Sequence, residues 1–182
     1  MIQTQKNARS TEYASFGDFC RIYVGQMNSL YLLSLLLTAD PQKAEQCFIS
    51  GFDDSVSNRF VFKERASFWA RRSIILQAIG LLRPRPNDER ESNKTKLLPA
   101  RGSVPTEVRM HPNFARIVEL DPFERFIFIM SVLEKYSVQE YSLFLGCFRG
   151  DVIKARTAAI RHLASVLITG ERHSSSAAFT LA

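Results

Sequence analysis

The 182-residue sequence has few cysteines and no long hydrophobic run. Its three cysteines, Cys20, Cys47 and Cys147, are odd in number and far apart, which provides no disulfide framework and favours a reducing compartment. The most apolar stretch, Ser29–Ala39, is much shorter than the roughly 20 residues that span a bilayer. The opening residues contain no apolar segment of signal-peptide length. We therefore expect a cytoplasmic protein with no membrane insertion.

The sequence also lacks the common catalytic motifs. Its eight glycines form no phosphate-binding loop, and neither a nucleophile elbow nor an HExxH motif is present. The three histidines are not placed at metal-ligand spacing from cysteines or carboxylates. We therefore expect no enzyme activity, no catalytic residues, no cofactor and no metal site.

The composition favours a folded, basic protein. Hydrophobic residues make up 46% and charged residues 23% of the chain, with fourteen phenylalanines, so a core can form. The formal net charge is +6, and the pI is about 9.5. A positive charge of this size favours a polyanionic partner such as nucleic acid.

Two apolar blocks flank a polar middle that contains five prolines and many charges. Such a middle segment cannot bury enough apolar surface to offset the entropy of ordering it. We expect an all-α fold of two small helical domains joined by a flexible linker. The expected divisions are a first domain at 11–83, a linker at 84–113, a second domain at 114–170 and a disordered tail at 171–182.

Helix-start signals support the all-α class. Asp40–Pro41 and Asp121–Pro122 each place an N-cap side chain before a proline at the first helical position. Ser137 and Glu140 have the spacing of a capping box, in which each side chain accepts from the other residue's amide. No strand-like alternation bounded by turn residues is visible.

The stretch after this capping box has the pattern of a helix-turn-helix. A short helix ends at Gly146, and a longer basic helix follows. On a helical wheel one stripe of the longer helix is apolar, and its opposite face is polar. This spacing fits a DNA recognition helix, and it equally fits a packed three-helix unit with a solvated basic face. The apolar stripe holds Val152, Ala155, Ala159, Leu163 and Val166, and the opposite face holds Lys154, Thr157, Ala158 and Arg161.

The second block resembles region 4 of sigma-70-family transcription initiation factors, especially the small extracytoplasmic-function (ECF) type. The matching motifs are Glu124–Arg125, Glu134–Ser137, Glu140–Ser142, Leu145–Gly146 and Val152. The resemblance implies a helix-turn-helix that contacts promoter DNA. The expected DNA-binding residues on its recognition helix are Arg149, Lys154, Thr157 and Arg161.

The first block resembles the start of region 2 of the same family. Asp40, Ala44 and Glu45 match, whereas Gln46 and Ile49–Ser50 replace the acidic and Gln-Glu residues that family members use to bind polymerase. The expected polymerase-binding residues are Ala44, Glu45, Phe48 and Phe52.

Aromatic and basic residues alternate in the stretch after this helix. Aromatic faces can stack on unpaired bases while cations hold phosphates, and the resembling family uses this region to capture opened promoter DNA. The expected DNA-binding residues here are Arg59, Lys63 and Arg71.

The resemblance implies a transcription initiation factor that binds core RNA polymerase and directs it to promoter DNA. An anti-sigma protein is a further partner that such a factor can have. Two alternatives stay open. One is a helix-turn-helix regulator that has lost polymerase recruitment, and the other is a protein–protein adaptor of the transcription machinery that does not read DNA.

Overall fold

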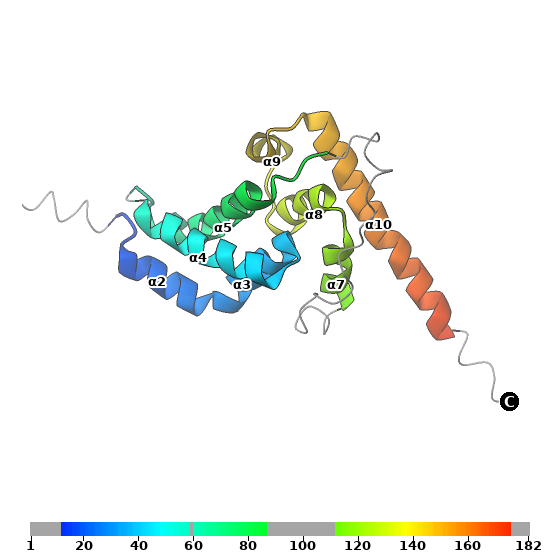
Figure 1. Cartoon of the computed structure of the whole chain (residues 1–182), viewed down its shortest axis with the longest axis horizontal. Coiled ribbons are helices and arrows are strands. Elements are labelled where there is room, and N and C mark those ends of the chain that lie inside the picture. The colour runs from blue at the N-terminus through cyan, green and yellow to red at the C-terminus, as the bar shows by residue number, and fades with distance from the viewer. Residues whose placement is uncertain (1–11, 59, 87–111, 176–182) are drawn as a thin grey trace, which may run out of the picture. The chain divides into compact units, whose positions relative to one another are not determined.

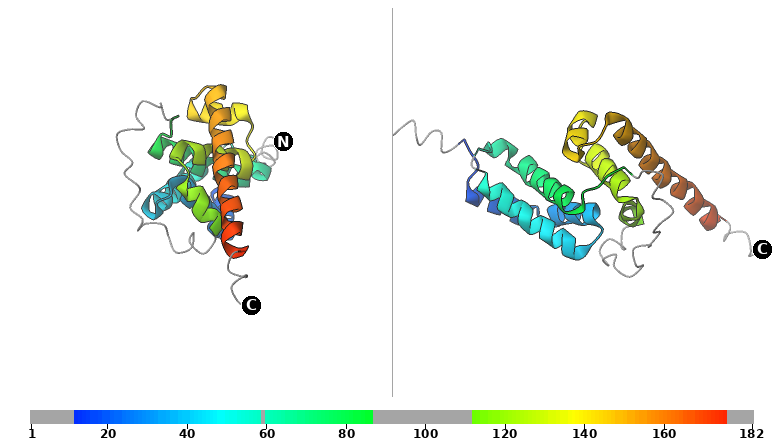
Figure 2. Two further views of the ribbon diagram at one scale, coloured as in Figure 1. Left: turned by 90° about the vertical axis from the view of Figure 1, so that its right-hand side faces the viewer. Right: turned by 45° about the horizontal axis from the view of Figure 1, so that its top comes forward.

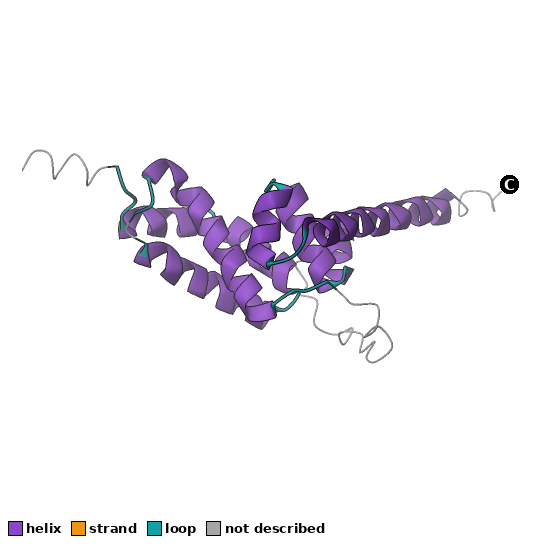
Figure 3. Cartoon of the chain, turned by 90° about the horizontal axis from the view of Figure 1, so that it is seen from above, coloured by secondary structure: helices purple, strands orange, loops and turns teal. Residues whose placement is uncertain are grey.

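The computed structural model describes residues 12–58, 60–86 and 112–175, with side chains described to 165 (Figure 1). Every regular element in these ranges is a helix, which confirms the expected all-α class (Figure 3). The chain divides into two compact units, Met1–Arg83 and Pro84–Ala182. Most of the expected linker, residues 84–113, lies outside the described residues, so its flexibility stays a prediction. No helix in the described ranges is both long and apolar enough to cross a bilayer.

In the residues that the structure describes, the first unit is a bundle of four α-helices, and many of its buried residues lie on α3. Ser34 and Thr38 lie inside its core, and each hydroxyl donates to a carbonyl one turn earlier, at 3.1 and 2.9 Å. Their polar atoms are therefore satisfied without a partner from another helix. The elements are α2 (Phe16–Gly25), α3 (Met27–Thr38), α4 (Pro41–Ser57), the 3-10 turn η1 (Lys63–Arg65) and α5 (Ala66–Leu82).

Helices α4 and α5 lie side by side (Figures 1 and 2). Gly51 of α4 packs directly against Ile74 of α5. A Cβ atom on Gly51 would lie 2.7 Å from Ile74 Cγ1 and 3.2 Å from the Ile74 backbone nitrogen and Cα. The absence of a side chain at Gly51 thus permits the close packing of the two helices.

In its described residues, the second unit begins with helices α7 and α8, which come before the turn that joins α9 to α10. Arg125 of α8 is buried, and its Nη1 donates to the carbonyls of Val118 at 2.9 Å and Leu120 at 3.3 Å. Burial lowers the pKa of Arg125 to about 10, while the nearby Asp121 carboxylate favours the charged form, so the side chain stays protonated at neutral pH. Arg125 therefore joins the end of α7 to α8. The elements are α7 (Pro112–Glu119), α8 (Pro122–Phe128), the π-helical turn η2 (Ile129–Leu133), α9 (Val138–Leu145) and α10 (Arg149–Ser175).

Two features of the second unit differ from the sequence-based expectations. The helix that starts at Pro122 continues into a π-helical turn, which the periodicity did not predict. The last helix, α10, runs to Ser175, whereas a tail was expected to begin at residue 171. The remaining tail, 176–182, lies outside the described residues.

Tyr141 of α9 gives a stability prediction. Its side chain is fully buried, and its hydroxyl has no hydrogen-bond partner among the described residues. A buried polar group without a partner destabilises the folded state by about 1–3 kcal/mol. We expect Tyr141→Phe to leave the free energy of unfolding unchanged or to raise it by about 1 kcal/mol, as measured by urea denaturation.

Tyr23 provides the matched control. Its buried hydroxyl lies 3.2 Å from Ser55 Oγ and can donate to the Ala70 carbonyl at 3.4 Å. Tyr23→Phe removes these contacts, so it should lower the free energy of unfolding by about 1 kcal/mol. If Tyr141→Phe destabilises the protein as much as Tyr23→Phe, the Tyr141 hydroxyl has a partner in solution.

Candidate nucleic-acid interfaces

Exposed aromatic side chains gather at the beginning of α5 in the first unit. Phe60 is 81% and Phe62 41% exposed. The Tyr13 ring stacks on Phe62 with ring centroids 4.9 Å apart, and it meets Phe60 edge-on at 6.4 Å. We call Tyr13, Phe60 and Phe62 the aromatic cluster. Such exposed rings can stack on unpaired bases.

Backbone pairing holds the aromatic cluster in place. Tyr13 and Phe62 form an isolated antiparallel bridge, in which the Ala14 amide donates to the Val61 carbonyl at 2.7 Å. The Lys63 amide donates to the Glu12 carbonyl at 3.0 Å. Because neighbouring residues in extended backbone point to opposite sides, Val61 packs into the core while Phe60 and Phe62 face outward.

Cations flank the aromatic cluster. Lys63 is exposed, and its Nζ lies 3.7 Å from the Asp18 carboxylate. Hydrogen bonds from Ser15 hold the pKa of the Asp18 carboxyl below its usual value, so Asp18 is anionic at neutral pH. Arg65, in the same 3-10 turn as Lys63, is exposed too. Arg65 belongs to the same aromatic and basic stretch of the sequence, but it was not among the expected DNA-binding residues.

The three basic residues expected on this surface do not share one setting. Lys63 lies beside the aromatic cluster, as described. Arg71 is half-buried, and its Nη1 donates to Ser29 Oγ at 2.9 Å, so part of its guanidinium is used to join α5 to α3. Arg59 lies outside the described residues. The surface therefore differs from the expected one, because Arg71 has a structural contact and because Tyr13 joins from a distant part of the chain.

The aromatic cluster yields a binding prediction. Stacking of a base on an aromatic side chain contributes about 1–3 kcal/mol. We expect Phe60→Ala to weaken binding of a labelled single-stranded oligonucleotide about tenfold, as measured by fluorescence anisotropy. The melting temperature should change little, because the Phe60 ring is largely solvent-exposed.

Phe16 is the matched control, because it is also a largely exposed phenylalanine but lies in α2, outside the aromatic cluster. Phe16→Ala should leave the affinity for the oligonucleotide unchanged. Equal affinities of the Phe60→Ala and wild-type proteins would exclude the aromatic cluster as a stacking surface.

In the second unit, a tight turn joins α9 to α10, at the place where the sequence predicts a helix-turn-helix. Ser137 Oγ accepts from the Glu140 amide at 3.3 Å, and Glu140 Oε2 accepts from the Ser137 amide at 2.7 Å, which confirms the capping box. α9 ends at Gly146, whose φ of 62° lies in the left-handed region that favours glycine. The Cys147 amide then donates to the Ser142 carbonyl at 3.1 Å and closes the turn.

The burial of the described side chains of α10 agrees with the predicted faces except at Ala158, which was expected on the outer face and is half-buried. The inward residues Val152, Ala155 and Ala159 are buried, and α10 packs on α8 and α9. Leu163 is half-buried, and the side chain of Val166 lies outside the described ones. All four expected DNA-binding residues of this helix are exposed: Arg149, Lys154, Thr157 and Arg161.

The expected polymerase-binding residues of α4 do not form one surface. Ala44 is fully buried, so its side chain is not available to a partner. Phe48 and Phe52 are half-buried and pack edge-on against Tyr23, with ring centroids 5.4 and 5.0 Å apart. Of the four, Glu45 alone is exposed. Core packing explains the burial of Ala44, Phe48 and Phe52, because all three side chains lie on the face that α4 turns toward the bundle.

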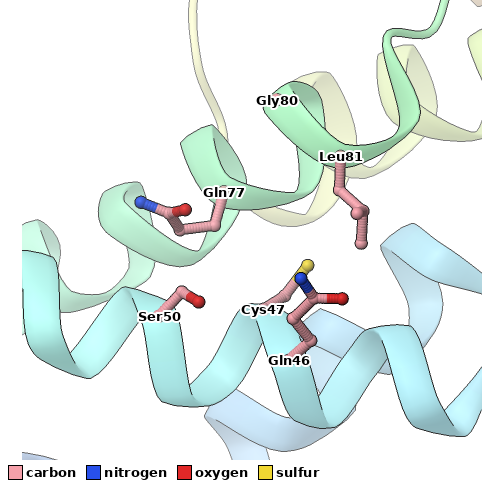
Figure 4. A pocket seen from close by; sticks show the side chains of 6 residues that line it. All are labelled: Gln46, Cys47, Ser50, Gln77, Gly80 and Leu81. Atoms are coloured by element: carbon pink, nitrogen blue, oxygen red, sulfur yellow. The ribbon is translucent and has the colours of Figure 1, made fainter.

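A cavity of about 250 Å³ lies between α4 and α5 (Figure 4). Figure 4 shows the Gln46 amide and the Cys47 sulfur on the side of α4 that faces Leu81 of α5. Burial raises the pKa of the Cys47 thiol to about 11, so it stays protonated at neutral pH and is a poor nucleophile. The lining residues are uncharged, which suits neither an anion nor a metal ion: they are Gln46, Cys47, Ser50, Gln77, Gly80 and Leu81.

In the part of the chain that the structure describes, no three His, Cys, Asp or Glu residues gather where they could hold a metal ion. No protein-family model matches the chain, and no curated protein matches its sequence.

Proposed function

We propose that this protein is a divergent sigma-type transcription initiation factor that binds core RNA polymerase and directs it to promoter DNA. The observation that carries the proposal is the helix-turn-helix of α9 and α10. Its recognition helix buries a narrow stripe and presents four side chains suited to phosphates and base edges. Those side chains are Arg149, Lys154, Thr157 and Arg161.

The first unit supports the same proposal through a different kind of surface. The aromatic cluster with Lys63 and Arg65 has the chemistry of a single-strand binding site, because rings stack on bases and cations attract phosphates. A chain with one surface for duplex DNA and another for unpaired bases suits a factor that positions and opens a promoter. The proposed mechanism is not enzymatic: binding free energy stabilises the opened DNA. This function places the protein in the cytoplasm.

The deciding experiment is a run-off transcription assay with purified core RNA polymerase. Genomic fragments retained by the protein and polymerase together serve as templates, because the promoter sequence is unknown. We expect transcripts that require both components. DNA binding without polymerase association would favour the helix-turn-helix regulator, and polymerase association without DNA binding would favour the adaptor.

Glu45 gives a prediction for polymerase binding. It is exposed on α4, and it has no ion-pair or hydrogen-bond partner among the described residues. We expect Glu45→Lys to weaken association with core polymerase about tenfold, because a reversed charge on the contact surface opposes binding. Surface plasmon resonance on immobilised core enzyme measures this affinity. Glu119→Lys, a charge reversal at an exposed residue of α7 in the other unit, is the control and should bind as the wild type does.

A further inference from the structure

The outward face of α10 carries two exposed isoleucines beside its expected DNA-binding residues. Ile153 is 49% and Ile160 44% exposed. Thr157 and Ala164 are exposed too, and at about 100° per residue the four side chains lie within roughly 60° of one another. We call Ile153, Thr157, Ile160 and Ala164 the outer stripe. It is distinct from the inward residues that pack on α8 and α9.

The spacing of the outer stripe is that of a helix-packing seam. Its members follow one another at intervals of four, three and four residues, as the a and d positions of a coiled coil do. An isolated helix face in water usually carries polar residues, whereas exposed isoleucines at this spacing suit a second helix laid along the first.

The charges beside the outer stripe determine which helix fits. Lys154 and Arg161 lie on one side of it, Arg149 and Arg156 lie on the other, and all four are exposed. Between Arg149 and Ser165 the sequence has one carboxylate, Asp151, which is half-buried on the opposite side of the helix. A second copy of α10 would bring like charges together at the flanking positions, whereas a helix with acidic flanks would form ion pairs there.

We infer that the outer stripe docks an amphipathic helix of a protein partner, with apolar residues at its centre and aspartate or glutamate on both flanks. Docking itself does not require the protein to bind DNA. An effect of docking on transcription, by contrast, rests on the proposed function. Because Lys154, Thr157 and Arg161 would be covered, the partner and promoter DNA would exclude each other.

A synthetic peptide of about three heptads tests the inference, with leucine at a and d, glutamate at e and g, and alanine or glutamine elsewhere. Binding to the full chain is measured by fluorescence anisotropy. We expect micromolar binding that falls at least tenfold for the Ile153→Ser/Ile160→Ser protein. Leu143→Ser, a change of a 73% exposed leucine on α9, is the control and should leave binding unchanged.

Changes in the peptide test the same contact without altering the protein. A peptide with lysine in place of glutamate, and another with serine in place of leucine, should each bind at least tenfold more weakly. If the serine peptide binds as well as the leucine peptide, the contact is electrostatic only and the inference is wrong. It is also wrong if the double isoleucine variant keeps full peptide affinity, or if those isoleucines instead mediate self-association of the chain in sedimentation experiments.

A separate competition with duplex DNA distinguishes this inference from the proposed function. Peptide binding that leaves DNA binding intact would remove the regulatory consequence. A protein that binds the peptide but no DNA would contradict the proposed function while leaving the docking surface in place.

Discussion

A protein carrying both Lys154→Ala and Arg161→Ala is expected to bind duplex DNA about 10- to 100-fold more weakly than the wild type at ~0.1 M salt. Both side chains are exposed on the outward face of α10. Each phosphate contact releases counterions from DNA, so losing two contacts should reduce the slope of log K against log[salt] by about two. Salt titrations of DNA binding by fluorescence anisotropy measure both quantities.

The stability of this double variant should hardly change, because exposed charges usually alter it by about 0.5 kcal/mol or less. Lys43→Ala, on the exposed surface of α4, is the control for a general loss of positive charge and should keep the wild-type salt slope. A double variant with wild-type affinity and an unchanged slope would leave α9 and α10 as a packed helical unit with a solvated basic face.

Gly51→Val is expected to lower the free energy of unfolding by about 2–4 kcal/mol, the largest loss of stability predicted for this protein. The new Cβ would lie 2.7 Å from Ile74 Cγ1, and the Ile74 backbone at 3.2 Å cannot rotate away. α4 and α5 would therefore have to separate. Valine has a higher helix propensity than glycine by about 0.5 kcal/mol, which is too little to offset the free energy lost when the two helices separate. Urea denaturation of the full chain measures the change.

Gly80 provides the control for Gly51, because it is also a helical glycine of this helix pair, and a Cβ there would meet no atom within 4 Å. Gly80→Val should change the free energy of unfolding by no more than about 0.5 kcal/mol. Adding Ile74→Ala to the Gly51→Val protein removes the Cγ1 atom that the new side chain would meet, so the double variant should lose less stability than the sum of the two single losses. Equal stability of the Gly51 and Gly80 variants would show that the helices can separate at little cost.

The start of several helices could be predicted from the sequence because capping is local. Asp40, Asp121 and the Ser137–Glu140 pair bond to amides two or three residues away, so residue type and spacing suffice. The two faces of α10 were predictable for the same reason, since helical periodicity alone sets which side chains share a face. The four expected DNA-binding residues on that helix are accordingly exposed.

Other features depend on residues far apart in the sequence. Tyr13 reaches the aromatic cluster only because its backbone pairs with that of Phe62. The same dependence explains why two of the expected polymerase-binding residues of α4, Phe48 and Phe52, are half-buried, since their side chains pack against Tyr23. Arg71 meets Ser29 across two helices, which no spacing along the chain specifies.

The sequence by itself thus determined the all-α class, the main helix starts and the outward face of α10, because these follow from contacts within one or two helical turns. Tertiary structure decided which side chains are available to a partner. Ala44 was expected on the surface and is buried, whereas Ile153 and Ile160 are exposed although they are apolar. The reason is physical: burial depends on which face of a helix its neighbours cover, and the packing of all the helices in a unit determines that together.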